Sequence, residues 1–477
     1  MGPDREGPVV FDAHPSLLAD RDPFEAYGLA VTERDGDPRV VVAGNGDPNR
    51  FLRWDGDALV DELDEFRARS GVGSAPDGGA AALRAPDRHA IGVAAGDIDA
   101  DGEEEVYVHA TGSFAGGSPE ADLLCDPTDD GFVNLFDDAR NRGARNYTAG
   151  RSVAAIDRTG DGTHEFLVTG YAAPMRLYGA RGGVLDERAA DVGVDFLGGG
   201  RTLVVGPLVG TRTDVFVGME RGPNLLLAND GGGFTDFAPE RGVSDTHEQA
   251  RGAALVDTGD GLGLVLGNWN GHHRLFTGGD GRWTDVAPPA MVEPAPVRSV
   301  VAADFDDDGR QELFFNCLGG ANRFFSRADG DWTAVDPGAA TEPDARGTGA
   351  VAADVDGDGR LELLVAHGEG EGAPLSAFRA APADGAGSLR VRPRTRHGAP
   401  ARGAFVRLET DAGDDTAVQR RVVDGGSGYL CQGEPVAHFG LGGAAPERVT
   451  VRWPDGETTA EVEAPPPNEV LTVERPV

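Results

Sequence analysis

"VAADVDGDGRLELLVAHG", residues 351–368, crowds four carboxylates into nine residues between two apolar runs. Two apolar runs joined by a short turn are typical of a β-hairpin. Carboxylates this close together repel one another, so the turn needs a compensating charge. The stretch therefore predicts a hairpin whose turn holds a cation. Its acidic positions are Asp354, Asp356, Asp358 and Glu362, and its turn glycine is Gly359.

The acidic loop recurs along the chain. Loops of this kind begin near residues 31, 97, 157, 207, 257, 304 and 354, at steps of about 47 to 66 residues. A second hairpin often follows, with Asn-Asp-Gly or Gly-Asp-Gly turns that supply the positive φ angles of tight turns. Each unit therefore predicts a four-stranded antiparallel sheet. Seven such sheets predict an all-β fold, a seven-bladed β-propeller, because radial packing buries both faces of each sheet.

The repeat pattern also predicts the domain organisation. We expect residues 25–385 to form the propeller and residues 1–24 to be an N-terminal extension that is available to close the ring. After about residue 385 the fifty-residue pattern stops. Alternating apolar and polar residues in "AFVRLET" (404–410) and "ERVTVRWPDG" (447–456) predict a small C-terminal β-sandwich over residues 386–477.

Insertions lengthen the first two units. Residues 57–71 have apolar positions at helical spacing and form the only helix that the sequence predicts. Residues 110–148 are rich in Gly, Asp, Asn and Arg, which predicts a long loop.

Three copies of the acidic loop carry the full pattern acid-x-acid-x-acid-Gly-x-x-acid. Calcium binds six to eight oxygen ligands, and side chains at positions 1, 3, 5 and 9 can surround one ion. Glycine at position 6 allows the sharp turn, and the carbonyl at position 7 can point inward. A fourth copy, which begins at Asp157, has one carboxylate fewer, so we expect it to bind more weakly. The expected ligands are Asp97, Asp99, Asp101, Glu103 and Glu105; Asp157, Thr159, Asp161, Thr163 and Glu165; Asp304, Asp306, Asp308, Arg310 and Glu312; and Asp354, Asp356, Asp358, Arg360 and Glu362, with Glu103, Thr163, Arg310 and Arg360 acting through backbone carbonyls.

The loop is not an EF-hand, which needs a glutamate at position 12 and flanking helices. Position 12 is here Val108, Val168, Phe315 or Val365, inside a predicted strand. We expect about three to four Ca²⁺ ions, which brace the hairpins rather than do chemistry. Two alternatives are Mg²⁺, whose octahedral geometry suits this loop less well, and plain Asp-Gly turns without an ion.

The charge balance limits the partners. The formal net charge is −37, from 80 acidic and 43 basic residues. Such a surface repels phosphates and anionic lipids, so we expect no nucleic-acid partner and no membrane insertion. We interpret most of this acidic character as halophilic adaptation. Three widely spaced cysteines form neither a disulfide framework nor a zinc site. The sequence as written carries no export signal, so we expect a cytoplasmic protein, or an extracellular one if the true start codon lies elsewhere. We also expect the protein to be monomeric.

Two sequence resemblances sharpen these predictions. The acidic loops resemble the FG-GAP/VCBS repeats of integrin α-chain-type propellers, which implies calcium on the hairpin loops of a seven-bladed ring. The C-terminal region resembles the ASPIC/UnbV domain, and repeats followed by this domain resemble the arrangement in the cartilage acidic protein 1 family. The C-terminal resemblance is carried by Gln419, Gly428-Tyr429, Gln432, "HFGLG" at 438–442 and "WPDG" at 453–456.

Catalytic motifs do not appear in the sequence. There is no H-E-x-x-H, no G-x-S-x-G and no P-loop. His438 is interpreted as a packed structural histidine. We therefore expect a non-catalytic, calcium-binding β-propeller that acts as a binding or scaffold module for a protein or glycan partner. The alternative is an enzyme or assembly factor with a site at the central mouth of the propeller, which convergent polar side chains from several blades would favour.

Overall fold

The computed structural model describes residues 9–70, 82–278, 281–328, 330–370, 372–383, 385–411 and 416–476. Residues 1–8 of the expected N-terminal extension lie outside this described part, and so does Val477. Strands dominate the described residues, so the predicted all-β class is confirmed.

Seven groups of four antiparallel strands make up most of the described chain. The first four groups contain β2 (Ala26–Arg34), β3 (Asp37–Gly44), β4 (Arg50–Trp54) and β5 (Leu59–Asp61); β6 (Ala90–Gly96), β7 (Glu105–Ala110), β8 (Leu123–Thr128) and β9 (Gly131–Asn134); β10 (Gly150–Ile156), β11 (Glu165–Pro174), β12 (Arg176–Arg181) and β13 (Val184–Glu187); and β14 (Leu197–Gly206), β15 (Asp214–Met219), β16 (Leu225–Asn229) and β17 (Phe234–Asp236). The third and fourth groups are joined, because the long strand β11 also pairs with β14.

The other three groups follow along the chain. They contain β18 (Ala250–Asp257), β19 (Leu262–Asn268), β20 (Arg274–Thr277) and β21 (Thr284–Asp285); β22 (Val297–Ala303), β23 (Glu312–Cys317), β24 (Arg323–Ala328) and β25 (Asp331–Val335); and β26 (Gly347–Ala353), β27 (Glu362–His367) and β28 (Ser376–Ala380). The last group takes its fourth strand, β1 (Phe11–Ala13), from the other end of the chain, where β1 pairs antiparallel with β28.

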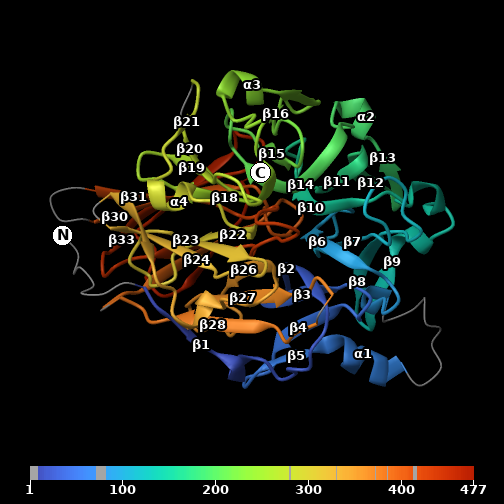
Figure 1. Ribbon diagram of the computed structural model, residues 1–477, viewed down its shortest axis with the longest axis horizontal. Helices are drawn as coiled ribbons and strands as arrows, with labels where there is room; N and C mark the ends of the chain where they lie inside the picture. The colour runs from blue at the N-terminus through green and yellow to red at the C-terminus, as the bar shows by residue number, and fades with distance from the viewer. Residues whose placement is uncertain are drawn as a thin grey trace.

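The seven groups form a closed ring. The first strand of each group contacts the first strand of the next, from β2 to β26, and β26 returns to contact β2. Figure 1 shows this circular arrangement, in which the blue N-terminal strands lie beside the orange strands of the last group. The ring has the architecture of a β-propeller, and each group corresponds to one of the repeat units predicted from the loop spacing.

The first strands approach one another closely, which explains their glycines and alanines. A Cβ atom on Gly92 would lie 2.1 Å from the carbonyl oxygen of Arg151 in the next group. Larger apolar side chains fill the space between neighbouring sheets, such as Val31, Val42 and Leu364 between the first and last groups. Burial of this apolar surface, at about 25 cal/mol per Å², is the main force that holds the ring together.

Each first strand carries a bulge near its start. The register between the first and second strands shifts there in all seven groups. A bulge of this kind turns a side chain out of the regular alternation. The residues within these shifts include Tyr27, Ile91, Arg151, Arg201, Arg251, Arg298 and Thr348.

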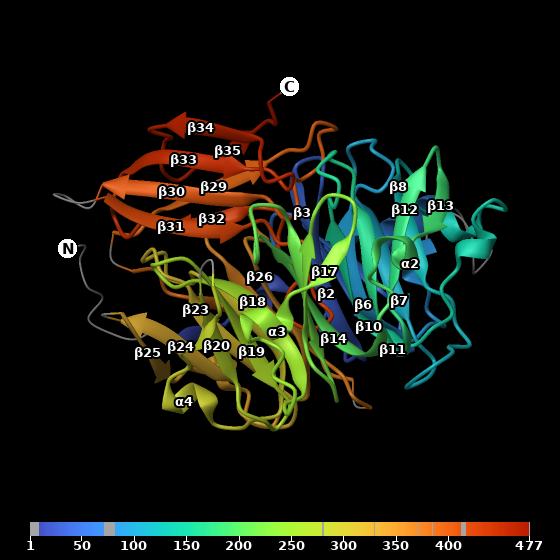
Figure 2. The same ribbon diagram turned by 90° about the horizontal axis from the view of Figure 1, so that it is seen from above.

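The C-terminal strands form two sheets that we call the tail domain. One sheet contains β32 (Ala437–Gly440), β29 (Ser388–Pro393) and β35 (Val470–Val473), and the other contains β31 (Thr416–Val422), β30 (Phe405–Asp411), β33 (Pro446–Arg452) and β34 (Thr459–Glu463). An apolar cluster that includes Trp453 and Phe439 lies in this domain, as expected of a small β-sandwich. Figure 2 shows the tail domain, in orange and red, lying against one side of the propeller.

Residues 424–433 of the tail domain, which we call the central segment, enter the middle of the ring. Their backbone hydrogen-bonds with the first strands of successive groups, so the propeller channel holds a piece of the tail domain. The contacts are Gly425 with Ala155, Gly426 with Val205, Gly428 with Ala253, Leu430 with Val93, and Gln432 with Leu29 and Val31. The side chain of Gln432 also exchanges two hydrogen bonds with the backbone of Ala95, at 2.7 and 3.0 Å.

Short helices connect the sheets. They are α1 (Glu62–Ser70), α2 (Ala189–Val192), α3 (Ala238–Arg241) and α4 (Pro289–Val292), with 3-10 turns η1 (Pro15–Leu17), η2 (Ala82–Arg84), η3 (Leu135–Asp137), η4 (Arg142–Ala144) and η5 (Ala339–Thr341). The expected helix over 57–71 thus starts later, after β5, and the expected long loop over 110–148 was wrong because it supplies β8 and β9. None of the helices among the described residues is long and apolar enough to cross a membrane.

Candidate metal centres

The four acidic loops share one turn geometry. In each, the first aspartate accepts a hydrogen bond from the backbone N–H of the glycine at position 6, at 2.8 to 3.2 Å. These glycines have φ angles between +83° and +97°, a conformation that L side chains adopt only with strain. The glycine of the sequence pattern is therefore required by the backbone. The four glycines are Gly102, Gly162, Gly309 and Gly359.

A glutamate closes three of the loops from the first residue of the next strand. Glu105, at the start of β7, accepts a hydrogen bond from the Ile98 N–H at 2.7 Å. Glu312 and Glu362 accept equivalent bonds from the residues that follow their own first aspartates, at 3.0 and 3.1 Å. Position 9 is thereby fixed beside position 1, which explains the spacing seen in the sequence.

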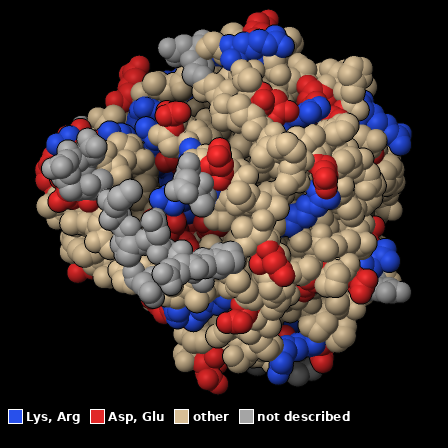
Figure 3. All heavy atoms as spheres, turned by 60° about the vertical axis from the view of Figure 1, so that its left-hand side comes forward, with Lys and Arg blue, Asp and Glu red and all other residues tan. Residues whose placement is uncertain are grey.

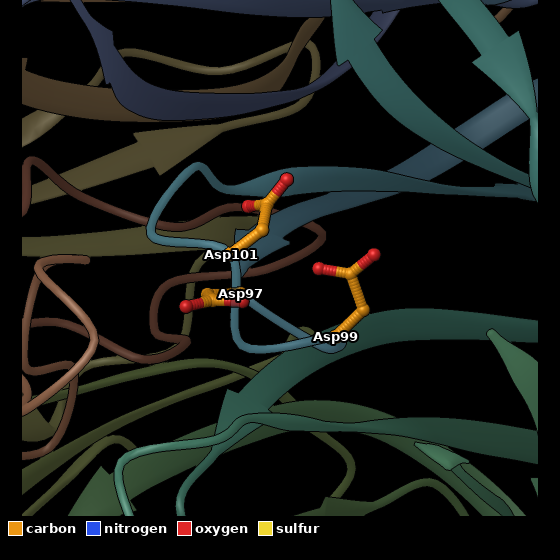
Figure 4. A group of neighbouring side chains, drawn as sticks. All are labelled: Asp97, Asp99 and Asp101. Carbon is orange, nitrogen blue, oxygen red and sulfur yellow. The ribbon is translucent and has the colours of Figure 1, made fainter. Parts of the chain in front are cut away.

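Three of the loops bring carboxylates together. In each group, one oxygen from every member lies within 4.8 Å of the others. Two oxygens on opposite sides of a calcium ion are about 4.6 to 5.2 Å apart, so this spacing suits one ion. Figure 4 shows the first group, whose side chains project from one tightly curled loop. The groups are Asp97, Asp99 and Asp101; Asp304, Asp306 and Asp308; and Asp354, Asp356 and Glu362.

Burial makes these charges costly. Burial, together with the neighbouring charges of Asp101 and Asp99, raises the pKa of Asp97 to about 7. Burial and nearby aspartates also raise the pKa values of Glu105, Asp304 and Glu312 well above their ordinary range. A carboxylate whose pKa is raised in this way keeps its proton to a higher pH than usual unless a cation replaces the proton.

Two buried oxygens point to a missing ligand. Asp304 Oδ1 and Glu105 Oε1 have no hydrogen-bond partner among the described residues. Unpaired buried acceptors of this kind are rare in proteins. An oxygen-only donor set with unsatisfied carboxylates fits a hard divalent cation such as Ca²⁺.

The loop that begins at Asp354 differs, because arginines lie closer to its carboxylates than Arg421 lies to Asp304, at 3.7 Å. Arg379 pairs across the strands with Glu362 and donates to Asp356 at 2.6 Å. Arg390 of the tail domain lies 2.8 Å from Asp354. Asp358 contacts Arg379 and Arg360, so this expected ligand lies outside the three-carboxylate group.

The loop that begins at Asp157 has the same turn geometry as the others, but its acid at position 9, Glu165, pairs with arginines. Glu165 forms ion pairs with Arg158 and with Arg188, both at 2.7 Å. Burial raises the pKa of Asp157 to about 7, and Asp161 adds to the effect. Thr159 and Asp161 form no carboxylate cluster with it among the described residues.

The sequence reasoning missed Asp126. This residue lies on β8, one position beyond the paired Val106 and Cys125, and therefore opposite Glu105. Burial and the charges of Asp99 and Asp101 raise its pKa to about 6, so it adds to the negative charge around this loop. Asp126 is separated from the acidic loop by the insertion in this unit, so only the register of the strands could have identified it. Its counterpart in the last group is Arg379.

The loops lie where the tail domain meets the propeller. Asp304 accepts a hydrogen bond from the Gly440 N–H at 3.1 Å, and His438 Nε2 lies 2.7 Å from Asp307 Oδ1. The "HFGLG" motif thus packs on an acidic loop, and His438 has a structural contact as interpreted. A Cβ atom on Gly102 would lie 2.6 Å from the His397 carbonyl oxygen, so a second tail segment also touches a loop.

Family comparisons agree with this architecture. A model described as "FG-GAP-like repeat" matches residues 305–365, and one described as "ASPIC and UnbV" matches residues 394–477. The fold and loops thus define an FG-GAP-type propeller joined to an ASPIC/UnbV domain. Cartilage acidic protein 1 of Xenopus tropicalis is 41% identical over 508 residues, which cover 98% of this chain and 75% of that protein. The human and mouse proteins of this name are each 40% identical, over 94% of this chain and 71% and 72% of their own lengths. The chain belongs to the cartilage acidic protein 1 family.

Proposed function

We propose that this protein is a non-catalytic binding module whose propeller is braced by Ca²⁺ and presents a surface to a protein or glycan partner. One observation carries the proposal: three clusters of carboxylates, each with at least one buried member, lie at the junction between the propeller and the tail domain. A divalent ion in each would turn mutual repulsion into attraction and fix the loops on which the tail domain rests.

The three carboxylate clusters differ in the neighbouring groups that would help or hinder calcium binding. Asp97, Asp99 and Asp101 gain a further acid in Asp126, whereas the group at Asp304 has an unpaired buried oxygen. The group at Asp354 shares its carboxylates with Arg379, so it should bind more weakly. The loop at Asp157 should be the weakest of the four.

The test is a calcium titration of the metal-stripped protein, by calorimetry and by thermal unfolding. Calcium should bind in a small whole number of sites and raise Tm, because an ion that binds only the folded state stabilises it by mass action. At a calcium concentration 100 times the Kd, one site contributes about 2.7 kcal/mol. Unchanged melting curves with calcium and with a chelator would overturn the proposal.

A matched pair of variants locates the ions. Asp304→Asn should remove one site from the stoichiometry. Asp260→Asn removes the same charge from an exposed position in the degenerate fifth loop and should leave the stoichiometry unchanged. Loss of a site in both variants would show that net charge, and not the cluster, binds calcium. Titration with Mg²⁺ under the same conditions distinguishes the two ions.

The partner is sought with calcium bound. Figure 3 shows one face of the molecule, on which acidic and basic side chains are interspersed with other residues. A mixed face of this kind suits a specific protein or glycan better than a general polycation. A glycan array and an affinity capture, each eluted with a chelator, test for such a partner. Binding that is equally strong with and without calcium would argue against a calcium-dependent partner.

A second candidate function is favoured by polar side chains from several sheets at the central mouth. Arginines from four first strands lie there, which suits an enzyme or assembly factor with a site at that place. A broad hydrolase and oxidoreductase screen of the calcium-loaded protein distinguishes the two candidates, since turnover is expected only of this one.

A further inference from the structure

Four arginines occupy the bulges of consecutive first strands. Arg151, Arg201, Arg251 and Arg298, which we call the arginine ring, lie on β10, β14, β18 and β22. Each follows the start of its strand, whereas the acidic loops follow the ends of the first strands. The arginine ring therefore lies at the mouth of the channel that is opposite the tail domain.

The bulges explain why these side chains converge. In a regular strand, successive side chains point to opposite faces of the sheet. The register shift at each arginine breaks this alternation and can aim the side chain at the channel. All four arginines lie close to one residue of the central segment, Tyr429, whose ionisation they all influence.

Tyr429 forms the floor of the arginine ring. Its side chain is buried, and its hydroxyl oxygen accepts a hydrogen bond from Arg201 Nη1 at 3.2 Å. The guanidinium of Arg298 lies 5.7 Å from the centre of its ring. Tyr429 forms an apolar cluster with Ile91 and Leu430, and Tyr27 packs against this cluster.

The charges of the arginine ring are not balanced. Glu220 forms ion pairs with Arg201 and Arg251, and Glu369 pairs with Arg298. Arg151 donates instead to carbonyl oxygens, including that of Phe114 at 3.2 Å, and has no carboxylate partner among the described residues. Four guanidinium groups thus face two carboxylates, and the remaining positive charge is buried at a cost.

Two donors of the arginine ring are left unused. The Nε–H groups of Arg251 and Arg298 are buried and have no hydrogen-bond partner among the described residues. Arg251 is 6% exposed, so water does not readily satisfy it. A buried charged donor without a partner is expensive, so these two Nε–H groups are available to a ligand.

Aromatic rings support the guanidinium groups from the side. Arg151 and Arg201 lie over Tyr171, at 5.1 and 4.6 Å from the ring centre, and Arg251 and Arg298 lie over Trp269 at 5.5 and 5.0 Å. Stacking holds a guanidinium flat and leaves its N–H edge available for an anion. Phe114, at the rim, is 65% exposed, so the site borders on solvent.

We propose that the arginine ring is a binding site for an oxyanion, such as the carboxylate, sulfate or phosphate group of a small ligand or an acidic sugar. Arginine donors in a fixed fork bind such groups in two-point contacts. The ligand would neutralise the unpaired charge and occupy the Nε–H groups of Arg251 and Arg298. The proposal goes beyond the calcium function and does not depend on it, since the acidic loops lie at the other mouth.

The ionisation of Tyr429 is linked to this site. Burial raises its pKa, but Arg201, Arg298, Arg151 and Arg251 outweigh burial and lower the pKa of Tyr429 to about 7. The pKa of Tyr27 is raised to about 12, chiefly by burial, and the charge of Glu369 adds to this rise while that of Arg298 opposes it. A bound anion neutralises the arginines and must therefore raise the pKa of Tyr429, and by reciprocity the phenolate weakens anion binding.

The first test measures binding to the calcium-loaded protein by calorimetry. The probes are inorganic sulfate, inorganic phosphate and glucuronate, each at constant ionic strength with chloride as the reference. Saturable binding of at least one probe is expected, and the strongest of the three identifies the class of ligand. Arg251→Gln and Arg298→Gln should each weaken it about tenfold or more, because a charged hydrogen bond is lost. Arg181→Gln, at an exposed position elsewhere, should leave it unchanged.

The second test reads Tyr429 directly through tyrosinate absorbance during a pH titration, with Tyr429→Phe as the blank. A saturating probe anion should move the midpoint upward from about 7. This readout remains informative if an arginine variant folds poorly, because it needs only the unaltered arginine ring. A midpoint that does not move, or equal binding by the arginine variants and the unaltered chain, would overturn the proposal.

Discussion

Arg402 of the tail domain and Glu104 of the first acidic loop form a two-point ion pair, at 2.7 and 2.9 Å, in which both side chains are fully buried. Arg402 also donates to the Val31 carbonyl oxygen at 2.8 Å, and the Thr32 hydroxyl donates to Glu104 at the same distance. Glu104 directly precedes the closing glutamate Glu105. One ion pair therefore connects the tail domain, the first sheet and a candidate calcium loop.

Breaking this ion pair should destabilise the whole molecule. Arg402→Leu leaves the Glu104 charge buried without a countercharge, a change that costs about 3 to 5 kcal/mol in other proteins. The double variant Arg402→Leu/Glu104→Leu should recover a large part of that loss, because no lone charge remains. Urea unfolding of the two variants checks this. Equal destabilisation by the single and the double variant would contradict the expectation.

The calcium-free protein should lose stability as pH rises. The pKa of Asp97 is raised from 3.8 to about 7 and that of Glu362 from 4.5 to about 8, in both cases chiefly by burial. Between these values the folded state binds more protons than the unfolded state, so the free energy of unfolding falls from about pH 4 to about pH 8. Calcium replaces the protons and should remove this dependence. Thermal unfolding across this range, with calcium and with a chelator, measures the difference, and parallel curves would count against metal binding.

Removing one arginine should strengthen one site. Arg379→Ser frees Asp356 and Glu362, and we expect calcium affinity at that loop to rise about tenfold or more. Arg360→Ser is the matched control, because Arg360 contacts Asp358, which lies outside the carboxylate group. Calorimetry resolves the sites. An unchanged affinity in Arg379→Ser would mean that this loop does not bind calcium.

Cys431 should report whether the central segment leaves the ring. Its thiol is buried, its Sγ accepts a hydrogen bond from the Leu29 N–H at 3.4 Å, and burial raises its pKa to about 12. With Cys125→Ala and Cys317→Ala in place, a thiol reagent should label Cys431 slowly in calcium and at least about tenfold faster in a chelator. Equal rates in the two conditions would show that calcium does not hold the tail domain in place.

Local features of the fold could be predicted from the sequence, whereas features that depend on strand register could not. The turn at Gly102 and the closing position of Glu105 depend on a few consecutive residues, so their spacing is visible in the chain. Asp126 and Arg379 occupy equivalent places beside two such loops, yet one adds an acid and the other a competing cation. Only the pairing of β7 with β8 and of β27 with β28 reveals this.

The position of the central segment could not be predicted from the sequence either. Gln432 and the Gly428-Tyr429 pair carried the resemblance to the ASPIC/UnbV domain, but nothing in the tail domain's own alternation indicates that these residues lie inside another domain. Their hydrogen-bond partners, such as Ala95 and Ala253, are far away in the sequence. Contacts of this kind arise from the assembled ring and leave no local pattern.

The pairing of β1 with β28 has a consequence for biosynthesis. Among the described strands β1 comes first in the sequence, yet its neighbour β28 is translated only after the strands of the other six groups, and the residues that occupy the channel follow later still. A truncated product would therefore present an unpaired strand edge and an open hub, both of which invite aggregation and quality control. The propeller and its channel can therefore close only after residues 424–433 have been translated.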